Sequence, residues 1–223
     1  MHPISIPEEV IAQVRAQRGK LTRYERLSGP KTALIVIDLQ NVFMLPGMPV
    51  EVPAAREIVP TVNRLAAAVR SAGGKVVWVK MSLEKVTEEW SVFFDSDIHR
   101  ETLPELLPGS RGFELHAGLD VQPADTIIVK RRFSAFIQGS SEIDAFLRTA
   151  GIDTLLIAGT LTNICCESSA RDAMMLNYRV VFMADATAAL TDAEHNATLT
   201  TMLRVFADVA TADDVVTRLA APE

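Results

Sequence analysis

Three side chains that could carry out chemistry stand at or just after the ends of short apolar runs: Asp38, Lys130 and Cys165. Such runs are typical of buried strands, and ligands of open parallel α/β sheets bind outside the carboxyl ends of the strands. Taken alone, the aspartate could make a turn, the lysine could be solvated and the cysteine could be a small core residue. Their convergence at one sheet edge favours a catalytic site.

The three residue types suit nucleophilic attack on a carbonyl carbon. A helix N-terminus and a nearby cation lower the pKa of a thiol, so we expect a reactive thiolate at Cys165. Asp38 can take the thiol proton and give it to a leaving amine, while Lys130 holds the carboxylate in position. The segment Gly159–Cys165 predicts a tight turn whose backbone N–H groups can face a developing oxyanion.

The rest of the chain alternates between apolar runs and amphipathic segments. Strands are expected at 32–38, 75–80, 126–130, 154–158, 179–184 and near 208–211. Helices are expected at 7–18, from Ile58 to the stop at Gly73–Gly74, at 142–150, at 164–176, after the capping box Thr191–Glu194 and at 212–220. This alternation predicts a single α/β domain, a parallel sheet with helices on both faces.

Other polar and aromatic residues have weaker assignments. Residues 81–124 have no regular pattern, and so long a connection is often a pocket wall or a lid. The candidate substrate contacts are Phe43, Trp90, Phe136 and Asn163, and core packing is an equal alternative for the three aromatic residues. A substrate carboxylate could bind Arg131 or Arg132, although both arginines could equally be solvent-exposed residues at the end of a strand. Structural roles are expected for His195, Met174 and Met175.

The composition argues against several classes of partner. The 223 residues are 48% hydrophobic and 22% charged, which supplies a large core, and the formal net charge is −6. That charge argues against nucleic-acid binding. Apolar runs are too short to span a membrane, no secretory signal is visible, and two adjacent cysteines cannot form a disulfide framework. A cytoplasmic globular protein is expected.

Three motifs together, Asp38–Phe43, Lys130–Phe136 and Gly159–Ala173, resemble the isochorismatase-like cysteine hydrolases. This family includes nicotinamidases, N-carbamoylsarcosine amidases, ureidoacrylate amidohydrolases and biuret hydrolases. The similarity extends over roughly residues 31–211 and implies a Rossmann-like three-layer α/β/α sandwich with a mainly parallel sheet of about six strands. Residues 1–223 would form one such domain, with 1–30 as a lead-in helix and link.

The resemblance also implies roles for individual residues. Asp38, Lys130 and Cys165 match the family's Asp–Lys–Cys triad, and the family's non-proline cis peptide matches Thr160–Leu161. The backbone N–H groups of Leu161 and Cys165 would hold the oxyanion. The expected activity is cleavage of a C–N bond in a small ureide, carbamoyl compound or amide, through a covalent thioester that releases ammonia or an amine.

Departures from the family patterns narrow this expectation. Isochorismatases proper lack a cysteine at the nucleophile position, so Cys165 argues against hydrolysis of a vinyl ether. Nicotinamidases carry an Asp/His metal cluster after the first motif, but residues 42–57 contain neither residue. The four histidines, His2, His99, His116 and His195, show no ligand spacing, and neither a metal nor another cofactor is expected. The stretch Thr162–Cys165 looks closest to ureide-cleaving members. Family habit favours a homo-oligomer, a dimer or tetramer.

The doublet Cys165–Cys166 presents two thiols where the family usually has Cys-Val. Successive helical residues are rotated by about 100°, so both cannot face the same cleft. On a helix Cys165 shares its face with Ser168 and Asp172, whereas Cys166 shares its face with alanines. The pattern therefore predicts Cys165 as the nucleophile and Cys166 as a small buried thiol.

Two other function classes stay open at this point. A phosphoacceptor signalling domain also places an aspartate and a lysine at strand ends, but Asp38 has no acidic neighbour for Mg²⁺ and the chain is nearly twice as long as such domains. A catalytically silent binding member of the family is a second alternative. The intact Asp–Lys–Cys set argues against it, and an ammonia-release assay would separate the two.

Overall fold

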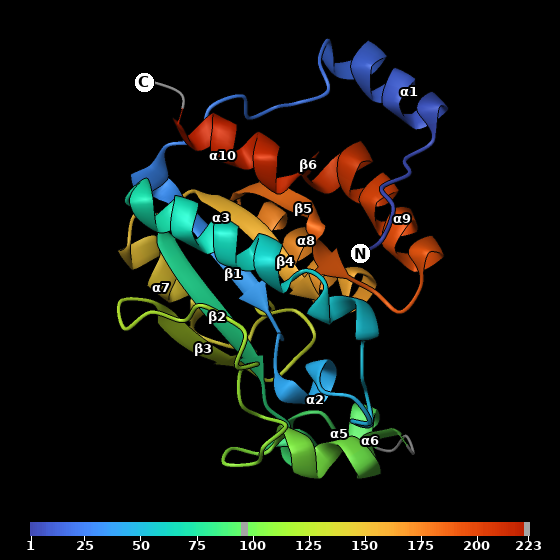
Figure 1. The fold of residues 1–223 in the computed structure, drawn as a ribbon, viewed down its shortest axis with the longest axis vertical. Helices are drawn as coiled ribbons and strands as arrows, with labels where there is room; N and C mark the ends of the chain where they lie inside the picture. Colours follow the sequence, from blue (N-terminus) through green and yellow to red (C-terminus); the bar gives the residue numbers. More distant parts are fainter. Residues whose placement is uncertain (95–97, 221–223) are drawn as a thin grey trace.

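A six-stranded sheet in which all paired strands run parallel forms the centre of the computed structural model, which describes residues 1–94 and 98–220 (Figure 1). The strand order is β3-β2-β1-β4-β5-β6. The strands are β1 Thr32–Ile37, β2 Lys75–Met81, β3 Thr126–Lys130, β4 Thr154–Thr160, β5 Arg179–Ala188 and β6 Asp208–Ala210. The α/β fold and six-strand count expected from the sequence are confirmed.

The central strands separate two apolar cores. Along β1, Leu34 and Val36 belong to one core while Ala33, Ile35 and Ile37 belong to the other. This division follows from the two-residue period of a strand, which sends successive side chains to opposite faces. Because both faces of β1 are buried, the strand reads as a continuous apolar run in the sequence.

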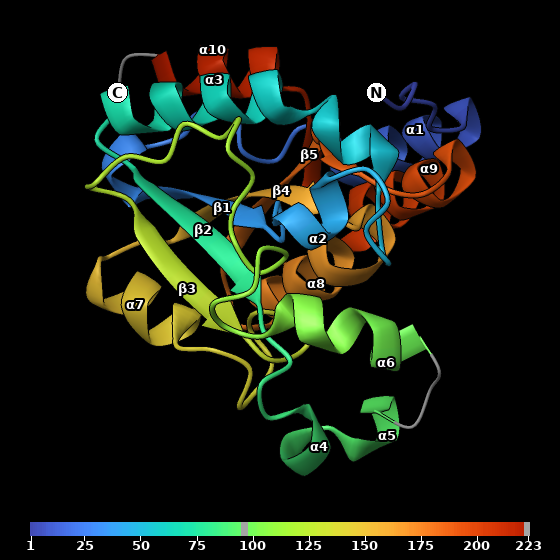
Figure 2. The same cartoon turned by 60° about the horizontal axis from the view of Figure 1, so that its bottom comes forward.

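Helices cover both faces of the sheet and complete three layers. Helices α3 (Val59–Ser71) and α10 (Ala212–Ala220) lie together on one face, and α7 (Ile143–Thr149) and α8 (Glu167–Met175) lie on the other (Figure 2). The capping box predicted at Thr191 opens helix α9 (Asp192–Thr201). These helices match the expected positions, and the three-layer α/β/α arrangement is confirmed.

The remaining elements are short apart from the first helix. Helix α1 spans Glu8–Arg18, and four-residue or five-residue helices are α2 Asn41–Met44, α4 Val86–Glu89, α5 Ser91–Phe94 and α6 Ile98–Thr102. Single 3₁₀ turns lie at Gly29–Lys31, Pro53–Arg56 and Leu103–Leu106, and π-helical turns at Thr162–Cys166 and Met202–Phe206. The expected helix 164–176 therefore starts earlier, as a π turn. Residues 81–124, expected to be irregular, contain most of the short helices.

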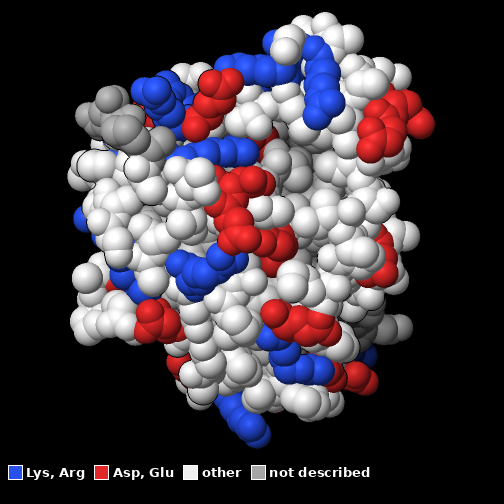
Figure 3. All heavy atoms as spheres, turned by 45° about the horizontal axis from the view of Figure 1, so that its top comes forward, with Lys and Arg blue, Asp and Glu red and all other residues white. Residues whose placement is uncertain are grey.

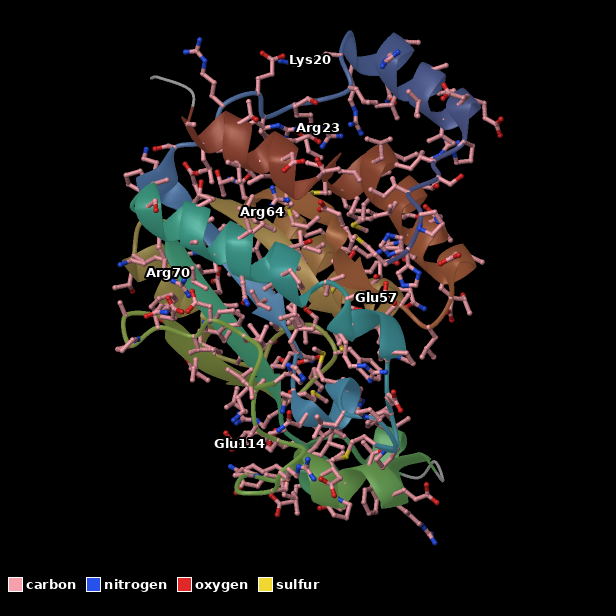
Figure 4. All side chains as sticks on the ribbon, in the orientation of Figure 1. Lys20, Arg23, Glu57, Arg64, Arg70 and Glu114 are labelled. Carbon is pink, nitrogen blue, oxygen red and sulfur yellow. The ribbon has the colours of Figure 1, made fainter. Side chains whose placement is uncertain are left out.

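Polar side chains fix the long connection before β3 to the sheet. Arg70, at the end of α3 in Figure 4, donates to both carboxylate oxygens of Asp125 at 3.0 and 2.7 Å and to Asp120 at 2.9 Å. The indole of Trp78 on β2 donates to Asp125 at 2.8 Å. Asp125 thus joins α3, β2 and the connection.

Charged side chains of both signs are interspersed over the face that carries α3 and α10 (Figure 3). Arg64 of α3 forms an ion pair with Asp213 of α10, which links the two helices across this face. No helix in the described parts of the chain is long and apolar enough to cross a membrane.

Candidate active site

The sheet edge at the carboxyl ends of β1 and β2 points toward α2 and the short helices α5 and α6 (Figure 1). Asp38 directly follows β1 and has a φ of 55°, in the left-handed region that aspartate and asparagine adopt more readily than most residues. Its N–H donates to Val79 O on β2 at 2.9 Å. Asp38 leaves the strand here, and its side chain is wholly buried.

Lys130 lies between the carboxylate and the thiol. It is the last residue of β3 and is also wholly buried. Its Nζ is 2.8 Å from Asp38 Oδ2 and 3.5 Å from Cys165 Sγ, and it donates to Arg132 O at 3.1 Å. The structure therefore brings together Asp38, Lys130 and Cys165, the three residues that the strand-end argument placed at one edge. We call them the buried trio.

Cys165 reaches this edge through the turn that follows β4. Gly159 has a φ of 114°, and a Cβ there would lie 2.0 Å from Ile37 O, so only glycine fits beside β1. The peptide between Thr160 and Leu161 is cis, as the family resemblance implied. The π turn Thr162–Cys166 then carries the thiol beside Lys130.

The two adjacent cysteines face different surroundings. Cys165 lines the cavity described below, whereas Cys166 does not. The Cys166 thiol is wholly buried and lies 3.8 Å from Ala158 O, against the core. The sequence-based separation of the doublet into a cleft-facing and a core-facing thiol is therefore confirmed.

The electrostatics of the trio differ from the sequence-based expectation. Burial raises the pKa of Cys165 to about 12; the attraction of Lys130 opposes this rise, and the negative charge of Asp38 adds to it. The expectation of a lowered thiol pKa is wrong because burial outweighs the nearby cation. The thiol is protonated at neutral pH, so it needs a base.

Asp38 is placed to be that base. Burial raises the pKa of the Asp38 carboxyl, against the attraction of Lys130 and a smaller lowering effect of the Cys165 thiol. A carboxylate with a raised pKa is a better proton acceptor. The pKa of Lys130 is raised, because attraction by Asp38 and Cys165 outweighs its burial, so Lys130 stays cationic.

Gln40 is a buried side chain near the site that sequence reasoning did not single out. Its amide accepts from Met81 N at 2.6 Å and donates to Met81 O at 3.1 Å and to Phe113 O at 3.0 Å. Met81 Sδ in turn lies 3.4 Å from Lys130 Nζ. Gln40 thus fixes the end of β2 beside the trio. A polar residue two positions after Asp38 is the one signal for it in the sequence.

A cavity of about 400 Å³ opens onto Cys165. Phe43 lines it, as expected, together with aliphatic and aromatic residues from the segments around 50 and 81–106, such as Leu83, Phe93 and Leu106. Residues of this long irregular connection form much of the wall, so its expected role is confirmed. Its individual lining residues carry no readable pattern in the sequence.

The other candidate substrate contacts lie elsewhere. Trp90 lies behind the wall, stacked on Phe93 at 4.1 Å and edge-on to Phe133 at 4.8 Å. Placing Phe136 in the pocket is wrong: it is buried in the core, 6.0 Å from the ring of Tyr178, and does not line the cavity.

Asn163 does not line the cavity either. It is half-buried in the π turn, and its Oδ1 has no hydrogen-bond partner among the described residues. Arg131 and Arg132 both pair with Glu89, at 3.1 and 3.8 Å, and neither lines the cavity.

Among the histidines whose side chains are described, His195 and His2 pair with each other. His195 is wholly buried, with Nδ1 3.0 Å from Thr162 Oγ1 and its ring stacked on His2 at 4.6 Å. Burial lowers the pKa of His195 to about 4, so the ring is neutral. The side chain of His99 lies outside the described residues. Within residues 1–94 and 98–220, no group of three or more His, Cys, Asp or Glu side chains is arranged to hold a metal ion.

Comparison with known proteins relates this geometry to a family. A model of the isochorismatase domain matches residues 32–214. The ureidoacrylate amidohydrolase RutB of Variovorax paradoxus is 32% identical over 208 residues, covering 85% of this chain and 82% of that protein. A probable inactive nicotinamidase of Arabidopsis thaliana is 36% identical over 176 residues, covering 78% and 89% respectively. The crystal structure of a cysteine hydrolase from Pseudomonas syringae pv. phaseolicola has a TM-score of 0.82 at 27% identity, covering 90% of this chain and 97% of that one.

Proposed function

This chain belongs to the isochorismatase domain family, and we propose that within this family it is a cysteine amidohydrolase that cleaves the C–N bond of a small amide, carbamoyl compound or ureide. The observation that carries the proposal is the position of Lys130 Nζ, 2.8 Å from Asp38 Oδ2 and 3.5 Å from Cys165 Sγ. Cys165 also lines the cavity, so a substrate there could reach the thiol. The name of the relative RutB, an amidohydrolase, supports the reaction class.

The first half of the proposed reaction acylates Cys165. Asp38 accepts the proton of the thiol, and Sγ forms a bond to the carbonyl carbon of the substrate. The backbone N–H groups of Leu161 and Cys165 hold the oxyanion. The C–N bond then breaks, and the departing nitrogen takes the proton from Asp38 and leaves as ammonia or an amine.

The second half regenerates the thiol. A water molecule gives a proton to Asp38 and attacks the thioester carbonyl carbon, and the C–S bond breaks. The proton on Asp38 returns to Cys165 as the acid leaves. Lys130 stays protonated throughout, because the pKa of its ammonium is raised, and holds the carboxylate in position while its charge changes.

This mechanism draws its base, its acid and its nucleophile from the chain itself, and no metal or cofactor takes part in any step. Hydrolysis of a vinyl ether is not favoured, because a thiol faces the cavity where a covalent nucleophile would act. A catalytically silent binding protein remains the second candidate. It is favoured by one observation, that a relative 36% identical is described as probably inactive.

Ammonia release separates the two candidates. The panel comprises simple amides, ureides, carbamoyl amino acids, maleamate and nicotinamide, each assayed with the unmodified chain, Cys165→Ser and Cys166→Ser. We expect turnover of at least one compound, lost in Cys165→Ser and retained in Cys166→Ser. No ammonia from any of them, together with an unreactive Cys165 thiol, would identify a binding protein and contradict the proposal.

A further inference from the structure

The described part of the cavity wall beside Cys165 is almost wholly apolar. None of the described residues that line it is charged, and Thr102 and Cys165 are the two that carry a hydroxyl or thiol. The others are aliphatic, aromatic or thioether side chains from several elements: Phe43 on α2, Leu83 after β2 and Leu161 after β4. A molecule in this cavity meets hydrocarbon on most sides.

Three cations at and just after the end of β3, Lys130, Arg131 and Arg132, are paired with anions. Lys130 forms its ion pair with Asp38, deep beside the thiol. Arg131 and Arg132 share the carboxylate of Glu89, and Arg132 also donates to the backbone oxygen of Glu89. None of the three is among the lining residues. A carboxylate on a substrate would lose its hydration in the cavity without meeting a cation among the described residues that line it.

The physical consequence is discrimination by charge. Removing a carboxylate from water without a partner is strongly unfavourable, whereas each methylene transferred from water to an apolar wall gains about fourfold in binding. The volume of about 400 Å³ is near the lower end of the range for small-molecule sites. It suits one ring or a short branched alkyl chain.

We infer that the group attached to the reacting amide or ureide is uncharged and apolar, so that anionic ureido and amido acids are poor substrates. The inference rests on the proposed amidohydrolase function and adds its substrate class. The relative RutB is described as acting on ureidoacrylate, so this chain would have a different preference from that protein.

Matched substrates test the inference with little change of shape. In 4-methylpentanamide an isopropyl group stands where succinamate has a carboxylate, and in 3-methylbutylurea it stands where N-carbamoyl-β-alanine has one. We expect kcat/KM to favour the uncharged member of each hydrolysed pair by about 100-fold or more. Phenylacetamide, with one ring, is expected to be hydrolysed as well.

A charge placed in the cavity wall provides a second test of the inference. Val92 lines the cavity but is 87% exposed, so Val92→Arg adds a cation without removing a buried side chain. We expect this variant to reduce the preference for the uncharged substrate by about tenfold or more. The matched control is Val205→Arg, at a position that is 51% exposed and does not line the cavity; its preference should be unchanged.

The outcomes distinguish failure of the inference from failure of the function. Hydrolysis of succinamate or N-carbamoyl-β-alanine as fast as its uncharged partner would overturn the inference and leave the amidohydrolase assignment standing. An unchanged preference in Val92→Arg would also overturn it, because the distal group would then lie outside the cavity. No hydrolysis of any amide or ureide would overturn the proposed function and the inference with it.

Discussion

Replacing Lys130 by methionine removes the charge of a buried ion pair while keeping the length of the side chain. Asp38 and Lys130 are both wholly buried and their charged atoms are 2.8 Å apart. In Lys130→Met the carboxylate keeps the unfavourable effect of burial and loses the attraction that opposes it. The pKa of Asp38 therefore rises further, which lowers the fraction of Asp38 in its proton-accepting form.

The size of the effect follows from burial. Breaking a buried pair by removing one partner typically lowers the free energy of unfolding by about 3–5 kcal/mol, because an uncompensated charge stays behind. Since the folded-state pKa of Asp38 in this variant lies above its unfolded value, the loss is smallest below the unfolded pKa and grows as the pH rises through the folded one. We expect kcat to fall by about 10²–10⁴-fold.

Urea denaturation followed by tryptophan fluorescence measures the loss, with kcat measured on the same samples. The double variant Asp38→Asn/Lys130→Met removes both charges and should be more stable than Lys130→Met by about 2 kcal/mol or more, while remaining inactive. The matched control is Lys80→Met. Lys80 is also buried, and its Nζ is 3.6 Å from Oε2 of Glu114, which is labelled in Figure 4. The side chain of Glu114 is 61% exposed, so the loss of unfolding free energy should be about 1 kcal/mol or less.

Two results would refute this reasoning. If the stability changes of Asp38→Asn and Lys130→Met simply add in the double variant, the two charges are not coupled. If Lys130→Met folds and retains near-native kcat at neutral pH, Lys130 does not hold Asp38 in its working form.

Three further predictions concern the surroundings of the trio. Cys166→Val should keep kcat within about twofold and stability within about 1.5 kcal/mol, because it replaces one small buried side chain by another. Exhaustive dialysis against EDTA should leave turnover unchanged, because the proposed steps use only groups of the chain and water. Lowering the pH from 6.5 to 4 should lower the melting temperature: His195 binds a proton at about 6.5 when unfolded but only at about 4 when folded. His195→Gln, which leaves the neighbouring titratable groups His2 and Asp192 in place, should weaken the dependence of the melting temperature on pH.

Each of these has a result that would contradict it. Loss of turnover in Cys166→Val with Cys165 intact would mean that the doublet has been assigned in the wrong order. Activity lost to EDTA and restored by Zn²⁺ or Fe²⁺ would contradict the metal-free mechanism. If the melting temperature of His195→Gln depends on pH as strongly as that of the unmodified chain, groups other than His195 cause the dependence.

The trio could be predicted from the sequence because each member ends or follows a strand that is visible as an apolar run. A parallel sheet brings the carboxyl ends of its strands to one edge, so the residue after β1 and the last residue of β3 meet without any knowledge of the loops. The cis peptide after β4 was expected only from the family resemblance, whereas the tight turn at Gly159–Cys165 was predicted from the residues themselves. The three-layer fold follows from the same alternation of runs.

The errors have physical causes that single residues do not reveal. Phe136 turns into the core because Ser134 Oγ accepts from Phe136 N and Ile137 N at 3.1 and 3.2 Å, and Ala135 N donates to Ser169 Oγ at 3.0 Å. These bonds form a turn that the spacing of aromatic residues cannot show.

The thiol pKa was wrong for a different reason. The helix and the cation near Cys165 are visible in the sequence, but the depth of burial that outweighs them is a property of the packed structure. The residues of the cavity wall could not be predicted for the same reason. Leu83, Phe93 and Leu106 meet only after a long connection folds back on itself.

The central claim is that Cys165 carries the acyl group during turnover, and peptide mass mapping tests it most directly. The chain is mixed with an amide that it hydrolyses, quenched with acid at a series of times and digested. We predict that the peptide containing Cys165 gains the mass of the substrate less ammonia or amine, and that the gain is absent in Cys165→Ser. An unmodified Cys165 at every quench time during turnover, or an adduct on Cys166, would contradict the account.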